Sequence, residues 1–133
     1  RILRDTAELI GYGINSVAIM SNDTVNYPDD SYENMKKIAA EYNYPFPYLI
    51  DETQDVAKAY GAVCTPDFFG YITDFELQYR GRLDASRKDT GPDGTRRDLF
   101  EAMKLVAHTG HGPQDQVSSI GCSIKWKEEA VEA

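Results

Sequence analysis

The segment that most constrains the fold of this chain is the stretch at residues 61–69. A helical apolar pattern over residues 56–60 ends at Gly61, a residue type that readily adopts the left-handed conformation found after helices. A Thr65–Pro66 pair follows, and an aromatic strand pattern begins at Phe68. Because a cis bond before proline costs only about 0.5–1 kcal/mol, we predict a cis peptide bond between Thr65 and Pro66 at the entry to this strand.

The rest of the chain alternates between helix and strand periodicity. Helices are predicted near the N-terminus and after Ser31, Asp51 and Thr95, and strands at residues 16–21, 48–50, 68–73 and 77–82. The first of these strands is a short apolar run of the kind that is buried on both faces. Alternating strands and helices, followed by a hairpin and a final helix, predict an α/β fold with a mixed sheet flanked by helices.

The helical patterns also predict which residues face the core and which residues cap the helices. Ser31 is expected to cap the second helix, and Asp51 with Gln54 resembles a capping box for the third. The apolar stripes predict three buried faces: Leu3, Ala7 and Ile10 in the first helix; Met35, Ile38, Ala39 and Tyr42 in the second; Leu99, Ala102, Met103 and Val106 in the last.

Residues 83–94 are polar and contain glycines, which predicts a surface loop between the hairpin and the last helix. A basic cluster lies in and after the hairpin. We interpret it as an ordinary surface face balanced by acidic neighbours, with a docking patch for an acidic partner as the alternative. The basic residues are Arg80, Arg82, Arg87 and Lys88, and their expected acidic neighbours are Asp84 and Asp89.

Composition excludes some classes of partner. The net charge of −8 argues against nucleic-acid binding, which needs clustered Lys and Arg for phosphate contacts. No apolar run approaches the roughly 20 residues that a membrane-spanning helix needs. The two cysteines are 58 positions apart (122 − 64) and form no Cys-x-x-Cys pair. They indicate either a reducing compartment such as the cytoplasm or a redox pair.

Several motifs together resemble the thioredoxin-like redoxins of the alkyl hydroperoxide reductase/thiol-specific antioxidant group, which are peroxiredoxin-like antioxidant proteins. The resemblance implies a thioredoxin-like fold over residues 1–126, with 127–133 as a C-terminal tail. The motifs are Tyr44-Pro45-Phe46-Pro47-Tyr48-Leu49, Asp51-Glu52-Thr53-Gln54, Cys64-Thr65-Pro66-Asp67-Phe68-Phe69, Tyr79-Arg80-Gly81-Arg82 and Ser119-Ile120-Gly121-Cys122-Ser123-Ile124-Lys125-Trp126.

In such a fold the first strand delivers a reactive cysteine to the start of the first helix, where the helix N-terminus lowers the thiol pKa. Here a helical pattern is already under way at Arg1. We therefore expect the first strand, the start of the first helix and the reactive cysteine to lie upstream of this chain. The absent strand would lie between those at 16–21 and 68–73, so these two strands are expected not to pair with each other.

The resemblance also implies a site around Thr65 and Pro66. These residues would face the reactive sulfur, with Thr65 offering backbone hydrogen bonds to a substrate or partner chain; an ordinary turn is the alternative. Cys64 lies beside this site and is either redox-active or a small buried apolar residue. Cys122 lies in a glycine-flanked tail and is either a resolving thiol or a free structural one.

The function implied is thiol-disulfide or peroxide reduction by thiolate attack on an S–S or O–O bond. The implied substrate is a peroxide or a protein disulfide, an external dithiol supplies the electrons, and self-association into a homodimer is allowed. No organic cofactor, metal, nucleic acid or membrane is implied. The alternative is a non-catalytic thioredoxin-fold module that binds extended peptides at the Thr65–Pro66 face. A cysteine at the start of the first helix would favour the enzyme.

Overall fold

The computed structural model of the chain describes residues 1–86 and 94–127. Parts of two predicted segments lie outside the described residues. They are most of the loop at 83–94, with Arg87, Lys88 and Asp89 of the proposed basic face, and all but the first residue of the tail at 127–133.

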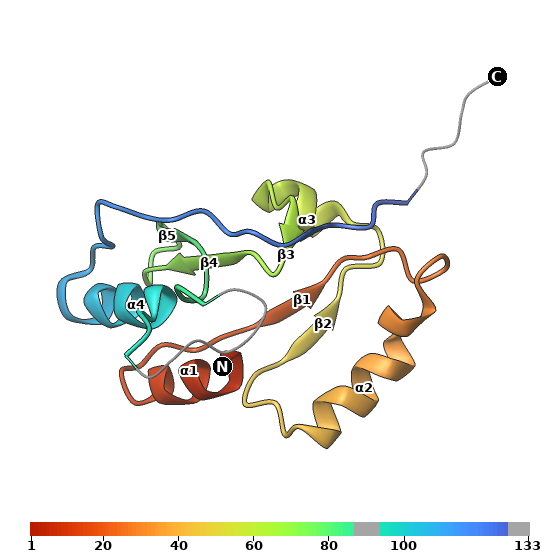
Figure 1. Ribbon diagram of the computed structural model, residues 1–133, viewed down its shortest axis with the longest axis horizontal. Helices are drawn as coiled ribbons and strands as arrows, with labels where there is room; N and C mark the ends of the chain where they lie inside the picture. Colours follow the sequence, from red (N-terminus) through yellow and green to blue (C-terminus); the bar gives the residue numbers. More distant parts are fainter. Residues whose placement is uncertain (87–93, 128–133) are drawn as a thin grey trace. The chain divides into compact units, whose positions relative to one another are not determined.

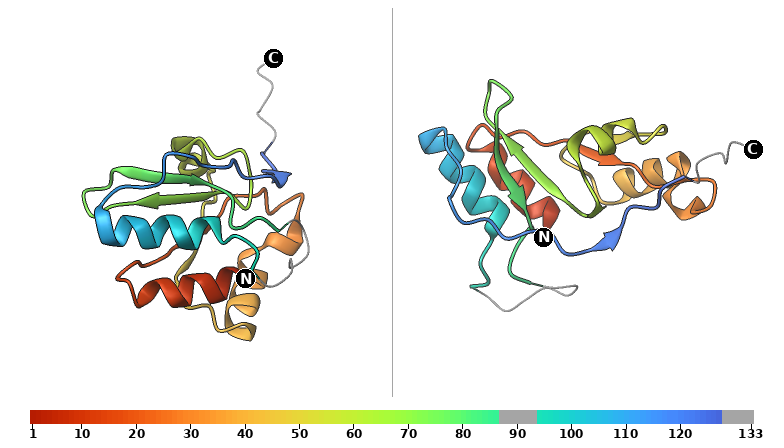
Figure 2. Two further views of the ribbon diagram at one scale, coloured as in Figure 1. Left: turned by 60° about the vertical axis from the view of Figure 1, so that its left-hand side comes forward. Right: turned by 90° about the horizontal axis from the view of Figure 1, so that it is seen from above.

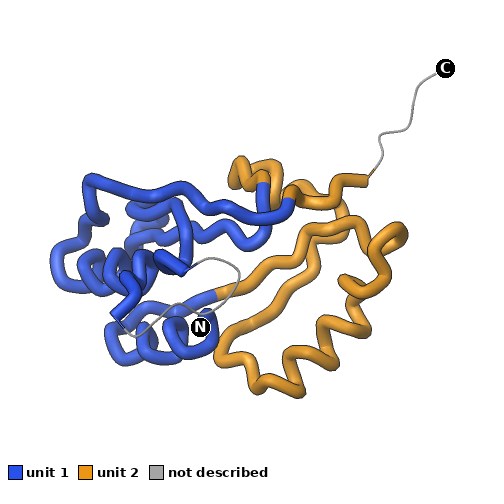
Figure 3. Tube along the Cα trace, in the orientation of Figure 1, with its two compact units in different colours: residues 1–16, 64–122 blue, residues 17–63, 123–133 orange. Residues whose placement is uncertain are grey.

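The described chain divides into two compact units (Figure 3). Unit 1 contains residues 1–16 and 64–122, and unit 2 contains residues 17–63 together with the chain from 123 onward. The elements, drawn in Figure 1, are α1 (Ile2–Ile10), β1 (Ala18–Met20), the 3-10 helix η1 (Pro28–Asp30), α2 (Tyr32–Glu41), β2 (Tyr48–Ile50), α3 (Asp55–Tyr60), β3 (Cys64–Thr65), β4 (Phe68–Tyr71), β5 (Leu77–Gly81), α4 (Asp98–Thr109) and β6 (Cys122–Ser123).

The strands pair in both senses. β1 is parallel to β2, with Ile19 opposite Leu49, and β4 is antiparallel to β5, with Phe69 opposite Arg80. β3 pairs with β6, so that the described strands form three two-stranded sheets. The mixed pairing predicted from the sequence is confirmed. The strands predicted at 16–21 and 68–73 belong to different sheets, as expected.

The core of unit 1 lies among α1, α4 and the β4–β5 pair. α1 and α4 lie side by side (Figure 2), and α4 also packs against β5. All four residues of the predicted α4 stripe are buried, which confirms that part of the prediction. The buried core consists of Leu9, Tyr79, Leu83, Leu99, Phe100, Ala102, Met103 and Val106.

The buried face of α1 differs from the predicted one. Asp5, Thr6 and Leu9 are buried and Ile2 packs against the core, whereas Ile10 is exposed. The helix therefore turns a charged residue inward, because Arg97 from the start of α4 donates hydrogen bonds to the Asp5 carboxylate. An apolar-stripe argument cannot find this face, since the partner of Asp5 is far away in the sequence.

The arginines of the predicted basic face have other partners than those expected. Arg82 Nε donates to Asp98 Oδ2 at 2.9 Å, at the start of α4, and Arg80 pairs with Asp67. Asp84 is buried and lies 3.8 Å from Arg1. The first residues after the hairpin are thus part of the core rather than a surface loop, because Leu83 is buried with Asp84.

Unit 2 contains the β1–β2 pair, α2 and α3. Ser31 caps α2 by accepting a hydrogen bond from Asn34 N, as predicted. Of the predicted α2 stripe, Met35 is buried while Ile38 and Tyr42 are exposed. Ile19 is also exposed, so β1 is not buried on both faces; alternate residues of a strand face opposite sides, and here only the side of Met20 is covered.

The start of α3 is not a capping box. The Asp51 carboxylate accepts hydrogen bonds from Ala57 N at 2.9 Å and from Ser21 Oγ at 2.8 Å. Gln54 instead donates from its side chain to the carbonyl oxygens of Ser21 and Lys125. Burial alone would raise the pKa of Asp51, but the hydrogen bonds from Ala57, Ser21 and the neighbouring backbone outweigh it and hold the pKa below its usual value.

Candidate functional site

The Thr65–Pro66 segment begins at the last residue of β3 and leads toward β4 in unit 1. The peptide bond between these residues is cis in the structure. Proline has no N–H to continue a sheet ladder, so β3 ends at Thr65 and β4 begins only at Phe68. Thr65 and Pro66 are both exposed. The segment predicted to face a reactive sulfur is therefore accessible to solvent.

Cys64 lies directly before this segment and is half-buried. Its Sγ is 3.9 Å from the carbonyl oxygens of both Pro66 and Ser119. Burial raises the pKa of the Cys64 thiol, the negative charge of Asp67 raises this pKa further, and the positive charge of Arg80 opposes both. The thiol is therefore mainly protonated at neutral pH, which makes it a weak nucleophile.

The Asp67–Arg80 pair is a part of the site that the sequence analysis missed. Arg80 Nη2 lies 3.3 Å from Asp67 Oδ2, and the guanidinium carbon is 4.9 Å from the centre of the Phe69 ring. The Asp67 side chain is 6% exposed and that of Arg80 is 43% exposed. The pair could have been predicted from the register of the hairpin. Because Phe69 is opposite Arg80, Asp67 is the diagonal neighbour of Arg80 on the same face.

Cys122 begins β6 and is exposed. The Thr65 hydroxyl donates to the Cys122 carbonyl oxygen at 3.4 Å, so the structure places Cys122 next to the Thr65–Pro66 segment as well. Both thiols are free in the structure.

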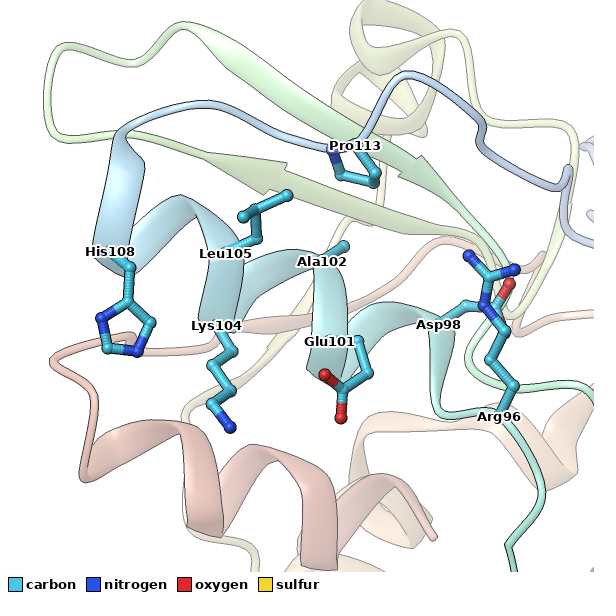
Figure 4. A pocket seen from close by; sticks show the side chains of 8 residues that line it. All are labelled: Arg96, Asp98, Glu101, Ala102, Lys104, Leu105, His108 and Pro113. Carbon is cyan, nitrogen blue, oxygen red and sulfur yellow. The ribbon is translucent and has the colours of Figure 1, made fainter.

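A cavity of about 370 Å³ lies elsewhere in unit 1, along α4 (Figure 4). Leu105 points toward Pro113, whereas Glu101 and Lys104 point to the other side of the helix. Neither cysteine lines this cavity, nor does Thr65, so the cavity and the predicted site are separate places. The lining residues are Arg96, Asp98, Glu101, Ala102, Lys104, Leu105, His108 and Pro113.

Two further properties bear on the site. Within residues 1–86 and 94–127, no three His, Cys, Asp or Glu side chains are grouped so that they could hold a metal ion. In the same part of the chain, no helix has both the length and the apolar composition required to cross a membrane.

A known protein family matches this chain over more than half of its length. Residues 6–86 match the model of the AhpC/TSA family, and these are more than half of the 133 residues. The chain belongs to the AhpC/TSA family. This is the group that its sequence motifs resembled, and it carries the thioredoxin-like fold. The matched residues include Cys64, Thr65 and Pro66 but end before Cys122.

Solved structures of two similar proteins agree with this assignment. An uncharacterized conserved protein from Geobacillus kaustophilus is 50% identical, with a TM-score of 0.88 over 96% of this chain and 68% of its own. A hypothetical protein from Sinorhizobium meliloti 1021 is 41% identical, with a TM-score of 0.89 over 96% of this chain and 70% of its own. A comparison with curated proteins gave no match.

The different environments of Cys64 and Cys122 in this AhpC/TSA family member predict different reactivities of the two thiols. With iodoacetamide at about pH 8, we expect Cys122 to be alkylated about tenfold faster than Cys64, because Cys122 is exposed whereas burial raises the pKa of Cys64. Peptide mass spectrometry during the reaction would measure both rates. In urea, where both thiols are exposed, the rates should converge. Faster labelling of Cys64 in the folded protein would contradict its position in the structure.

Proposed function

We propose that the protein containing this chain is a thiol-dependent antioxidant oxidoreductase of the redoxin type. It would reduce a peroxide or a protein disulfide with electrons from an external dithiol. The observation that carries the proposal is the exposed Thr65–Pro66 segment with one cysteine on each of the adjoining paired strands β3 and β6, in a chain of the AhpC/TSA family. The scarcity of cysteines, only two in 133 residues, supports a reducing compartment such as the cytoplasm.

The nucleophile of this proposed reaction comes from outside the 133 residues. A redox cysteine needs a thiolate at neutral pH, and a helix N-terminus is a common source of the lowered pKa. Cys64 lies in β3 and Cys122 in β6, so neither has this environment. Cys64 has in addition a raised pKa.

The chemistry balances with two thiols and one external reductant. The nucleophilic thiolate attacks one oxygen of a hydroperoxide, the O–O bond breaks, and the sulfur becomes a sulfenic acid while an alcohol or water leaves with a proton. A second thiol then condenses with the sulfenic acid, which forms a disulfide and releases water. An external dithiol reduces this disulfide by exchange and is itself oxidised.

Of the two cysteines here, Cys122 is the better candidate for the second, resolving thiol. Cys122 is exposed and held beside Thr65. The nucleophilic cysteine, once it carries a mixed disulfide or a sulfenic acid, would face Pro66 at this same place. Cys64 is half-buried. We therefore assign Thr65 and Pro66 to substrate contact, Cys122 to resolution, and Cys64 to a supporting position beside the site.

The test is peroxide consumption with dithiothreitol as the reductant. In the full-length protein, Cys122→Ser should still consume about one equivalent of peroxide but turn over at least about tenfold more slowly, because resolution is lost. Cys64→Ser is the matched control and should turn over at nearly the wild-type rate. The 133-residue chain alone should consume peroxide no faster than dithiothreitol in buffer.

Three outcomes would contradict parts of this proposal. Reductant-dependent turnover by the 133-residue chain, abolished by serine at one cysteine, would identify that cysteine as the nucleophile. Wild-type turnover of Cys122→Ser would remove its resolving role. A full-length protein inactive toward both peroxides and disulfides would favour the non-catalytic module that binds extended peptides at the Thr65–Pro66 face.

A further inference from the structure

The cavity of unit 1 follows one face of α4. Its size lies within the range of small-molecule sites, which is about 300–1,000 Å³. Leu105, 40% exposed, and Pro113 give it an apolar wall (Figure 4). Five of the lining residues have the spacing i, i+3, i+4, i+7 and i+10, which places them in one row along the helix; they are Asp98, Glu101, Ala102, Leu105 and His108.

At the start of α4, a buried carboxylate lines the cavity with only one of its oxygens hydrogen-bonded. The Asp98 side chain is 4% exposed, and its Oδ2 accepts from Arg82 Nε at 2.9 Å. Within the described part of the chain, Asp98 Oδ1 has no hydrogen-bond partner. Arg96 Nε is 3.8 Å away from Oδ1, which is too far for a hydrogen bond. Because a buried acceptor without a donor costs free energy, Oδ1 favours a ligand that donates to it.

Arg96 supplies a second polar group at the same end of the cavity. Figure 4 shows its guanidinium beside Asp98. The Arg96 side chain is 61% exposed, so it can turn toward a ligand and open the way to Oδ1 at small cost. A guanidinium binds a carboxylate through two parallel N–H donors. Since Arg82 already balances the charge of Asp98, a cationic donor at Oδ1 would be repelled by both arginines, and a neutral hydroxyl is favoured.

We propose that this cavity binds a small α-hydroxy acid with an apolar side chain. The hydroxyl donates to Asp98 Oδ1, the carboxylate accepts from the Arg96 guanidinium, and the hydrocarbon part packs against Leu105 and Pro113. In such a ligand the hydroxyl and the carboxylate are on adjacent carbons, which suits two protein groups only 3.8 Å apart. The site is separate from the Thr65–Pro66 segment and does not depend on the function proposed above.

The experiment is a titration of the isotope-labelled full-length protein, followed by the backbone amide signals of α4 in two-dimensional NMR spectra. The first probe is leucic acid (α-hydroxyisocaproate), for which we expect saturable shifts with a Kd of about 1 mM. Isocaproate lacks only the hydroxyl and should bind at least about tenfold more weakly, because Asp98 Oδ1 then stays unpaired. The amide of leucic acid lacks the carboxylate charge and should also bind about tenfold more weakly.

Two variants assign each part of the ligand to its partner. In Asp98→Asn an amide N–H can replace the accepting oxygen, so leucic acid and isocaproate should bind equally weakly. In Arg96→Gln, leucic acid and its amide should bind with equal affinity. Lys37→Gln is the matched control: it also removes one exposed positive charge, from α2 in unit 2, and should bind leucic acid as wild type does.

The absence of saturable shifts in α4 of the wild-type protein would overturn the inference. Equal affinities of wild type for leucic acid and isocaproate would remove the role of Asp98, and wild-type affinity of Arg96→Gln would remove the role of Arg96. If Asp98→Asn fails to fold, which collapsed signal dispersion would reveal, the comparison of the two acids on the wild-type protein still decides whether the hydroxyl is bound.

Discussion

Replacing Asp5 with alanine is expected to lower the free energy of unfolding by about 3 kcal/mol. The Asp5 side chain is fully buried, accepts hydrogen bonds from Arg97 and lies 3.0 Å from Arg4 Nε. Removal of one partner of a buried ion pair costs about 3–5 kcal/mol, because the other charge loses its compensation. We choose the lower end because Arg97 is a quarter exposed and also contacts Glu8.

Glu8→Ala is the matched control for this prediction. Glu8 binds the same Arg97 from the same helix, but its side chain is 47% exposed. Exposed ion pairs contribute about 0–1 kcal/mol, so this variant should unfold within about 0.5 kcal/mol of wild type. Urea unfolding of both variants, followed by circular dichroism, measures the difference. Equal losses in the two variants would show that the burial of Asp5 does not set the strength of the pair.

Replacing Tyr79 with phenylalanine is expected to lower stability at neutral pH and to raise it in alkali. Tyr79 is 1% exposed, and its hydroxyl donates to Arg82 O at 2.5 Å. Phenylalanine removes that hydrogen bond to the half-buried Arg82, which costs about 1 kcal/mol at pH 7. The ring remains, so no large cavity forms.

The effect of Tyr79→Phe on stability changes sign at high pH, because the ionisation of Tyr79 is coupled to unfolding. Burial, with a smaller contribution from Asp98, raises the pKa of Tyr79 from 10.0 to about 12. As the pH rises, Tyr79 therefore loses its hydroxyl proton in the unfolded chain before it does so in the folded one. The free energy of unfolding of the wild type falls by about 2 kcal/mol between pH 10 and pH 12. Tyr79→Phe lacks this loss, so its stability should exceed that of wild type above about pH 11. Urea unfolding between pH 8 and pH 12 tests this; parallel pH profiles would contradict it.

The parts of the fold that depend on neighbouring residues could be predicted from sequence. The helix that ends at Gly61, the strand Tyr48–Ile50, the β4–β5 hairpin and the α4 stripe all follow from local periodicity and turn residues, and the structure contains each of them. The cis bond expected at Thr65–Pro66 is present as well.

The candidate site was only partly predictable. Its exposed segment and its two cysteines could be located from motifs, but their relation could not. Cys64 and Cys122 turn out to lie on strands β3 and β6, which pair with each other. These strands are separated by more than 50 residues, and the chain between them contacts β5 through Gln116 and Ser119. No local pattern encodes that pairing.

By itself, the sequence determined the order of the α-helices and of strands β1, β2, β4 and β5, the family and the position of the Thr65–Pro66 segment, because these depend on side-chain size, periodicity and proline within a few residues. Only the tertiary structure decided which charges became buried and which sheet edges became occupied. Asp5 turns inward because Arg97 meets it there, and residue 121 can approach the Thr65 carbonyl group because Gly121 has no side chain to prevent it. Both outcomes depend on partners far apart in the chain, whose contacts form only when the chain is folded.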